Sequence, residues 1–218
     1  MAPFLVPDDA AGRARAVEAL RRGELVALPT DTVYGIAVTL DAPGGIERLF
    51  AAKHRPPEKG VVLLLADHHQ AGDVAELSAA FHVLAAAFWP GALTLVVRRR
   101  DDVSLPAALT GGAPTVGLRL ADHDAPRALA AELGPLPVTS ANRSGEPDAT
   151  DAAGVLAMLG DVADLTIVLD GGLARVGAPS SVVNCSVDPP HLLRAGALPA
   201  DVLSAVLEDA GLPALAPP

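Results

Sequence analysis

Leu25-Val26-Ala27-Leu28-Pro29-Thr30-Asp31-Thr32-Val33-Tyr34-Gly35, residues 25–35, is a short apolar run that leads into a polar loop. Its first four residues are apolar without alternation, which is typical of a strand buried on both faces of its sheet. Pro29 ends the run, so a loop is expected to follow the strand. Strands buried in this way belong to sheets that helices cover, and the segment therefore predicts an α/β fold.

The loop that follows is rich in hydrogen-bonding groups. Thr30, Asp31 and Thr32 place two hydroxyls and one carboxylate where a strand end meets a crevice, which favours a ligand-binding loop. The same residues are also typical of a turn that caps the next element. These residues alone leave both interpretations open.

Strands and helices alternate along the rest of the chain. Helices are expected over residues 9–22, 46–53, 79–89, 125–133, 151–159 and 199–210. Strands are expected over residues 25–28, 61–65, 93–97, 115–120, 137–139, 166–169 and 181–184. This order predicts a sheet flanked by helices. Without an internal repeat or a linker, we expect one domain over residues 1–200, followed by a C-terminal helix and frayed tail over residues 201–218.

Composition excludes several classes of protein. The formal net charge is -10, which argues against a surface that coats nucleic acid throughout, although a local basic cleft is compatible with it. A single cysteine, Cys185, allows no disulfide within the chain and no four-cysteine zinc site. The longest apolar run, Val83 to Trp89, is far below the roughly 20 residues that cross a bilayer. With no signal-peptide pattern at the start, we expect a cytoplasmic protein and no membrane partner.

Two further polar segments are candidates for anion binding. Residues 53–60 carry Lys53, Arg55 and Lys59; an arginine grips phosphate oxygens bidentately and lysines act as point charges. The alternative is that Lys53 interacts with its own helix end and the rest is a solvated loop. Residues 139–145 follow a short strand with small hydroxyl and amide side chains, among them Ser140 and Asn142, and form either a phosphate-binding turn or an ordinary one.

A fourth group lies on a later strand. Thr115 and Arg119 are four residues apart, so they share one face of that strand, and Ser180 and Arg194 follow further along. An arginine in an apolar strand needs an anionic ligand or an acidic side chain as its partner, and both remain open.

Familiar catalytic signals are missing. Gly172 and Gly177 have the spacing of a P-loop, but Ala178 and Pro179 replace its Lys and Ser/Thr. His68 and His69 fit a solvated pair in a loop better than a metal site. Cys185 fits a buried hydrophobic residue better than a nucleophile.

Seven segments in order carry a family resemblance. They are LPTDTVYGIAV (28–38), KHRPPEKGVVLLL (53–65), WPGALTLVV (89–97), TVGLRLADH (115–123), TSANRSGEPDAT (139–150), GAPSSVVN (177–184) and LLRAGAL (192–198). Together they resemble the YrdC-like threonylcarbamoyl-AMP synthases, in their short single-domain form. The resemblance implies a twisted mixed sheet with a concave basic cleft.

The resemblance also implies an activity. Such enzymes join L-threonine, bicarbonate or CO2, and ATP into threonylcarbamoyl-adenylate and release pyrophosphate, with magnesium expected on the phosphates and no dedicated protein metal site. A partner transferase then modifies an adenosine next to the tRNA anticodon. Two alternatives stay open: an RNA-binding module without catalysis, and a carbamoyl-handling enzyme without threonine specificity.

Roles for individual residues follow from the resemblance. Thr32, Arg119, Ser180 and the backbone near Val138 are expected to contact threonine. The expected ATP contacts are Arg55, Lys59, Thr115, Ser140, Asn142 and Arg194. Lys53 and Arg55 are expected to be catalytic through charge stabilisation. Such members often have serine at the position of Asp148, so this chain departs from the family pattern at that contact.

Overall fold

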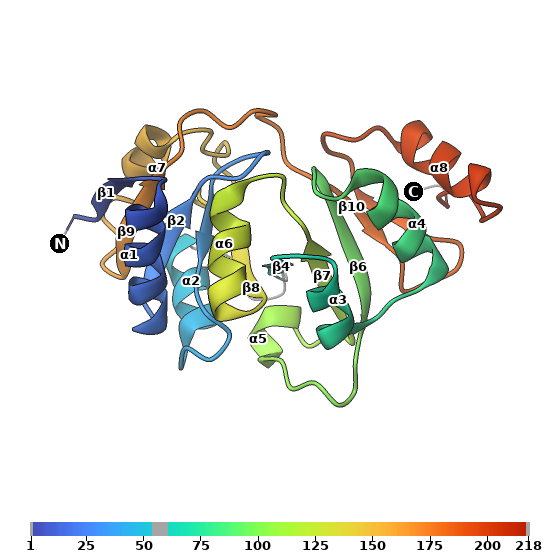
Figure 1. Cartoon of the computed structure of the whole chain (residues 1–218), viewed down its shortest axis with the longest axis horizontal. Coiled ribbons are helices and arrows are strands. Elements are labelled where there is room, and N and C mark those ends of the chain that lie inside the picture. Colours follow the sequence, from blue (N-terminus) through green and yellow to red (C-terminus); the bar gives the residue numbers. More distant parts are fainter. Residues whose placement is uncertain (1, 54–60, 217–218) are drawn as a thin grey trace.

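The computed structural model describes residues 2–53 and 61–216, in which eleven strands form one mixed sheet (Figure 1). The strands are β1 Phe4–Pro7, β2 Leu25–Leu28, β3 Gly35–Ala37, β4 Val62–Leu64, β5 Ala75–Glu76, β6 Leu93–Arg99, β7 Thr115–Arg119, β8 Leu136–Ser140, β9 Leu165–Asp170, β10 Ser181–Asn184 and β11 His191–Arg194. Their order across the sheet is β1-β9-β2-β3-β8-β4-β7-β6-β10-β11, with β5 paired to β6. The predicted α/β fold with a mixed sheet is confirmed.

Helices flank this sheet. They are α1 Ala10–Arg21, α2 Gly45–Lys53, α3 His69–Val74, α4 Ala79–Phe88, α5 Ala107–Thr110, α6 Asp124–Leu133, α7 Ala152–Leu159 and α8 Ala200–Asp209. In Figure 1, α1 and α6 lie side by side over the half of the sheet that contains β2 and β8, and α4 and α8 pack together at the opposite end. Within the described residues no helix is both long and apolar enough to cross a membrane.

Strand β2 is buried on both faces. Leu25 and Ala27 of β2 belong to the larger apolar core, whereas Val26 and Leu28 point into a second core under α1 and α6. All four residues are fully buried. Continuous hydrophobicity in this run therefore reflects two packed faces, as expected.

Three helices begin at a side chain that caps them. The Asp9 carboxylate accepts a hydrogen bond from Gly12 N at 2.8 Å, and the Ser78 hydroxyl accepts one from Phe81 N at 3.2 Å. Asp151 caps α7 in the same way, at 2.7 Å from Gly154 N. Each side chain satisfies a backbone donor that the first helical turn leaves open.

Two local expectations are wrong. His69 begins helix α3 instead of lying in a loop, and the His68 ring packs 5.8 Å from the Trp89 ring. The tail is not frayed through Ala216, because Ala216 N donates to Pro190 O at 2.8 Å and Leu212 and Leu215 pack against the core. Two leucines three positions apart hold this segment although it is rich in proline and alanine.

Cys185 should be chemically inert in the folded protein. Its side chain is buried, and burial raises the pKa of the thiol to about 12. Because the thiolate is the reactive form, we expect no reaction with Ellman's reagent at pH 8 under native conditions and one equivalent after unfolding in guanidinium. Rapid labelling of the native protein would contradict this placement.

Candidate functional site

A cavity of about 440 Å³ opens on the sheet between the loop after β2 and strands β4, β7, β6 and β10. Seven residues assigned a role from the sequence line it: Thr32, Thr115, Arg119, Val138, Ser140, Ser180 and Arg194. The expectation that Thr115 and Arg119 share one strand face is confirmed, since both open into this space. Segments more than 150 residues apart in the sequence thus meet at one site.

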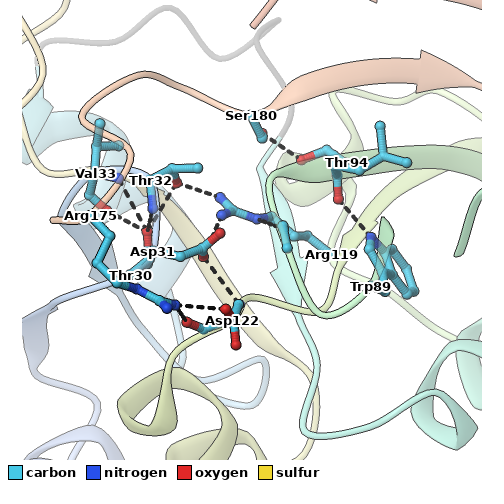
Figure 2. Close-up of polar contacts among 12 residues, drawn as sticks. Thr30, Asp31, Thr32, Val33, Trp89, Thr94, Arg119, Asp122, Arg175 and Ser180 are labelled. Atoms are coloured by element: carbon cyan, nitrogen blue, oxygen red, sulfur yellow. Dashed lines mark hydrogen bonds and ion pairs between the residues drawn. The ribbon is translucent and has the colours of Figure 1, made fainter. Parts of the chain in front are cut away.

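Arg119 is the buried cation of the cavity. Figure 2 shows its guanidinium pointing toward Thr32 and Asp31. Nη1 donates to Thr32 Oγ1 at 2.7 Å, Nη2 to Asp31 Oδ1 at 2.6 Å, and Nε to Gly91 O at 3.0 Å. The sequence left open whether Arg119 pairs with an acidic side chain or with a ligand. Its acidic partner is Asp31, and Arg119 also lines the cavity.

Burial and neighbouring charges act on Arg119 in opposite directions. Burial lowers the pKa of its guanidinium, the Asp31 carboxylate opposes that shift, and the charge of Arg194 adds to it. An arginine starts so far above neutrality that it keeps its charge at pH 7. The cavity therefore holds a fixed cation suited to a carboxylate or phosphate.

The polar loop after β2 is both a turn and a wall of the cavity. Thr30 Oγ1 donates to Val33 O at 2.6 Å and accepts from Thr32 N at 3.1 Å. Tyr34, buried below, donates its hydroxyl to Gly172 O at 2.8 Å and accepts from Gly171 N at 3.1 Å. Burial raises the pKa of Tyr34 to about 12. The loop thus forms a turn and also lines the cavity, and the Tyr34 hydroxyl is occupied by backbone groups.

Residues 171–180, here named the crossing segment, run from β9 over to β10 (orange in Figure 1). Val176 N donates to Asp31 O at 2.9 Å, and Gly177 N donates to Thr32 O at 3.0 Å. At the surface, Arg175 forms an ion pair with Asp122 at 2.7 Å (Figure 2). These bonds hold the segment that delivers Ser180 to the cavity.

Ser180 lies in a compact polar cluster. Its hydroxyl is 2.8 Å from Thr94 Oγ1 and 3.0 Å from Arg194 Nη2. Arg194 Nη2 also donates to Ser180 O at 2.7 Å. Burial lowers the pKa of Arg194, and the Asp148 carboxylate, also on the cavity wall, opposes that shift. A second cation thus faces the cavity across from Arg119.

Lys53 and Asn142 lie beside the cavity and are not among its lining residues. Lys53 is 1% exposed; its ammonium donates to Asn142 O at 2.7 Å, to Asn142 Oδ1 at 2.8 Å, and to Ser140 O. Ser140 Oγ donates to Asn142 Oδ1 at 2.7 Å. These contacts of Lys53 fix the turn that carries Ser140. Arg55 and Lys59 lie outside the described residues.

Comparison with known proteins places the chain in a family. Residues 18–196 match the model of the Sua5_yciO_yrdC family, whose description is Telomere recombination. The match covers most of the chain. The chain belongs to the Sua5–YciO–YrdC family.

Relatives within this family are similar in both sequence and structure. A Pyrococcus abyssi protein named threonylcarbamoyl-AMP synthase is 35% identical, over 86% of this chain and 55% of its own length. A Chromohalobacter salexigens protein of the same name is 39% identical, over 78% of this chain and 90% of its own length. The crystal structure of P. abyssi Sua5 complexed with L-threonine is 32% identical, with a TM-score of 0.85 over 94% of this chain and 60% of that one.

The Sua5–YciO–YrdC domain accounts for only part of some relatives. The chain spans 55% of the P. abyssi relative and 56% of a Bacillus subtilis relative named threonylcarbamoyl-AMP synthase. Structural similarity nevertheless extends over nearly the whole of this chain. The expected YrdC-like fold is thereby confirmed.

Sequence reasoning missed the Thr94 hydroxyl, which lines the cavity, and the pairing of Asp31 with the cavity residue Arg119. Thr94 is 1% exposed and lies at the second position of the apolar run 93–97. A hydroxyl residue inside an otherwise apolar strand was the signal that could have identified it. Asp31 stands in a loop already marked as polar, but nothing local pairs it with a residue 88 positions away. Thr94 pairs with Ser180 and Asp31 pairs with Arg119. Both pairings join residues that are distant in the sequence.

Proposed function

We propose that this chain synthesises L-threonylcarbamoyl-adenylate from L-threonine, bicarbonate or CO2, and ATP, and releases pyrophosphate. The observation that carries the proposal is the buried Arg119 guanidinium, held between Thr32 and Asp31 and open to the cavity. A similar structure, P. abyssi Sua5, is described as complexed with L-threonine. The product serves threonylcarbamoyladenosine modification of tRNA next to the anticodon, through a transferase partner in the cytoplasm.

On the amino-acid side, a carboxylate-binding cation and hydroxyls converge. Arg119 pairs with the threonine carboxylate, since a guanidinium is the favoured partner of that group. Thr32 and Ser180 supply hydroxyls, and the backbone near Val138 completes the pocket wall. A zwitterionic amino acid fits this mixture of charge and hydroxyls better than an apolar ligand does.

On the nucleotide side, Arg194, Thr115 and Ser140 face the same space. Arg55 and Lys59 are assigned to the phosphates together with them. Asn142 is assigned a contact at the rim of the turn, where it already bonds Lys53. We assign Lys53 to positioning that turn, and Arg55 to direct stabilisation of charge. The domain over residues 1–200 is proposed to carry the complete reaction.

The reaction needs positioning more than a side-chain nucleophile. The neutral amine of threonine attacks CO2 to give a carbamate and loses one proton. A carbamate oxygen then attacks the α-phosphorus of ATP while the bond from that phosphorus to the bridging oxygen breaks, and pyrophosphate leaves. Holding both substrates in one cavity supplies the proximity, and fixed cations stabilise the charge on the phosphates.

Magnesium is proposed to arrive with ATP. In the described parts of the chain, no group of three or more His, Cys, Asp or Glu side chains is arranged to hold a metal. Magnesium is commonly held through substrate phosphates with few protein ligands. The residues that line the cavity are compatible with a magnesium ion that the nucleotide carries. It would neutralise phosphate charge during transfer.

Identification of the product tests the proposal. The full chain is incubated with ATP, bicarbonate and carbon-14-labelled threonine, and the mixture is analysed by chromatography and mass spectrometry. We expect a labelled adenylate with the mass of threonylcarbamoyl-AMP. Absence of that product, together with RNA binding that survives substitution of Ser140 and Arg119, would instead favour a non-catalytic RNA-binding module.

Asp148 is expected to weaken nucleotide binding. Its carboxylate lines the cavity near Arg194 and adds negative charge where phosphates are proposed to bind. Asp148→Ser should lower KM for ATP about two- to fivefold, because a partly exposed charge pair contributes about 1 kcal/mol or less. The effect should shrink at 0.5 M salt. A higher KM for ATP would show that the carboxylate binds the nucleotide or its cation.

A further inference from the structure

Asp31 is a buried carboxylate directly behind the cavity cation. Its side chain is 4% exposed, and it is not among the residues that line the cavity. Oδ1 accepts from Arg119 Nη2 at 2.6 Å and from Asp122 N at 3.2 Å. Asp31 therefore contacts Arg119, which lines the cavity, without lining the cavity itself; Figure 2 shows this contact.

We infer that Asp31 is a positioning residue, which fixes the guanidinium plane of Arg119 so that its remaining N–H groups point at the carboxylate of the amino-acid substrate. This inference rests on the proposed function for the identity of the ligand. It adds a role for a residue that neither the family resemblance nor the cavity lining assigns.

Hydrogen-bond accounting supports the inference. A guanidinium has five N–H donors in a rigid fork. Among the described residues, Gly91 O, Thr32 Oγ1 and Asp31 Oδ1 take one donor each from Nε, Nη1 and Nη2. Two donors, one on each terminal nitrogen, are left for a ligand. Since bonds to two segments, the loop after β2 and the turn at Gly91, fix the plane, those two donors have a defined direction before substrate arrives.

Charge gives a second reason. An unpaired guanidinium buried this deeply would be costly, and burial does lower the pKa of Arg119 while Asp31 opposes the shift. Asp31 thus stabilises the buried cation. Because Asp31 lies behind Arg119, it compensates the charge without occupying the ligand side.

The backbone of Asp31 extends the same network to the crossing segment. Asp31 O accepts from Val176 N at 2.9 Å, and the neighbouring Thr32 O accepts from Gly177 N at 3.0 Å. That segment ends at Ser180, which lines the cavity beside Arg194. The position of Asp31 is therefore fixed from both its side chain and its main chain.

The test compares binding of L-threonine with that of L-threoninol, which lacks the carboxylate, by calorimetry on the full chain. Asp31→Ala should weaken threonine binding about tenfold or more, the scale of a lost charged hydrogen bond, and shrink the preference for threonine over threoninol by a similar factor. Asp31→Asn keeps an acceptor at the Oδ1 position and should restore threonine binding to within about threefold. A folded Asp31→Ala variant with the wild-type preference would overturn the inference.

A matched control separates positioning from stability. Asp8 is also a buried carboxylate, 2.6 Å from Arg13 Nε, but outside the cavity. Asp8→Ala should lower the melting temperature and leave the preference for threonine over threoninol unchanged. An equal loss of preference in Asp8→Ala would reduce Asp31 to a general stabiliser.

A measurement on the wild type covers the case in which Asp31→Ala does not fold. The inference predicts that the Arg119 guanidinium is rigid without ligand and gives resolved, slowly exchanging Nη proton signals in nitrogen-15 spectra, assigned by their loss in Arg119→Lys. Averaged signals would overturn the inference even if threonine binds. Resolved signals in a protein that binds no threonine would contradict the proposed function alone.

Discussion

Arg119→Gln is expected to raise KM for threonine about a hundredfold and to change KM for ATP less than about threefold. The substitution removes the buried cation that is proposed to pair with the threonine carboxylate, and a charged bidentate contact of this kind contributes roughly 3 kcal/mol. Steady-state pyrophosphate release, with each substrate varied in turn at saturation of the others, measures both constants.

The control for this variant is Arg127→Gln. Arg127 Nε donates to the Ala66 carbonyl at 3.2 Å, outside the cavity, so neither KM should change. Equal increases in the threonine and ATP constants for Arg119→Gln would contradict its assignment to the amino-acid side.

Lys53→Met is expected to lower the free energy of unfolding by about 3 kcal/mol or more. The ammonium is buried and donates to Asn142 O, Asn142 Oδ1 and Ser140 O, and each buried acceptor left without a donor costs roughly 1–3 kcal/mol. Urea denaturation followed by circular dichroism measures the change. A fall of roughly 6–12 °C in melting temperature should accompany it in a chain of this length.

Arg48→Met is the comparison for Lys53. Arg48 also donates to two backbone carbonyls, Pro43 O at 2.7 Å and Gly23 O at 2.6 Å, but its side chain is 34% exposed. Water can replace those bonds, so the loss should stay below about 1.5 kcal/mol. Unchanged stability of Lys53→Met with lost activity would return Lys53 to a direct catalytic role.

The sequence predicted those elements whose signal is local. Strands β2, β4, β6 and β10 are apolar runs, and helices such as α4 have a capping residue at their start, so propensity and pattern agree. Strand β3 was missed because Gly35–Ala37 continues a polar loop and becomes a strand only through pairing with β2 and β8. Strand β11 was missed because it is largely exposed and lies at the end of the sheet beside β10.

The sequence predicted those parts of the site that single residues or family motifs indicate. Arg119 stood out as a cation in an apolar strand, and the resemblance brought Ser180 and Arg194 to the same cavity. What the sequence could not supply is how these groups are held. The pairing of Asp31 with Arg119 spans 88 positions, and the bond between Lys53 and Asn142 spans 89. Such contacts depend on topology, which no local pattern contains.

Pyrophosphate release with each substrate omitted in turn tests the central claim most directly. The purified chain is assayed with ATP, L-threonine and bicarbonate, then without each one, in buffer depleted of CO2. We predict release that requires all three substrates and stops when threonine or bicarbonate is left out. Release that continues without threonine, or no release from the complete mixture, would contradict the account.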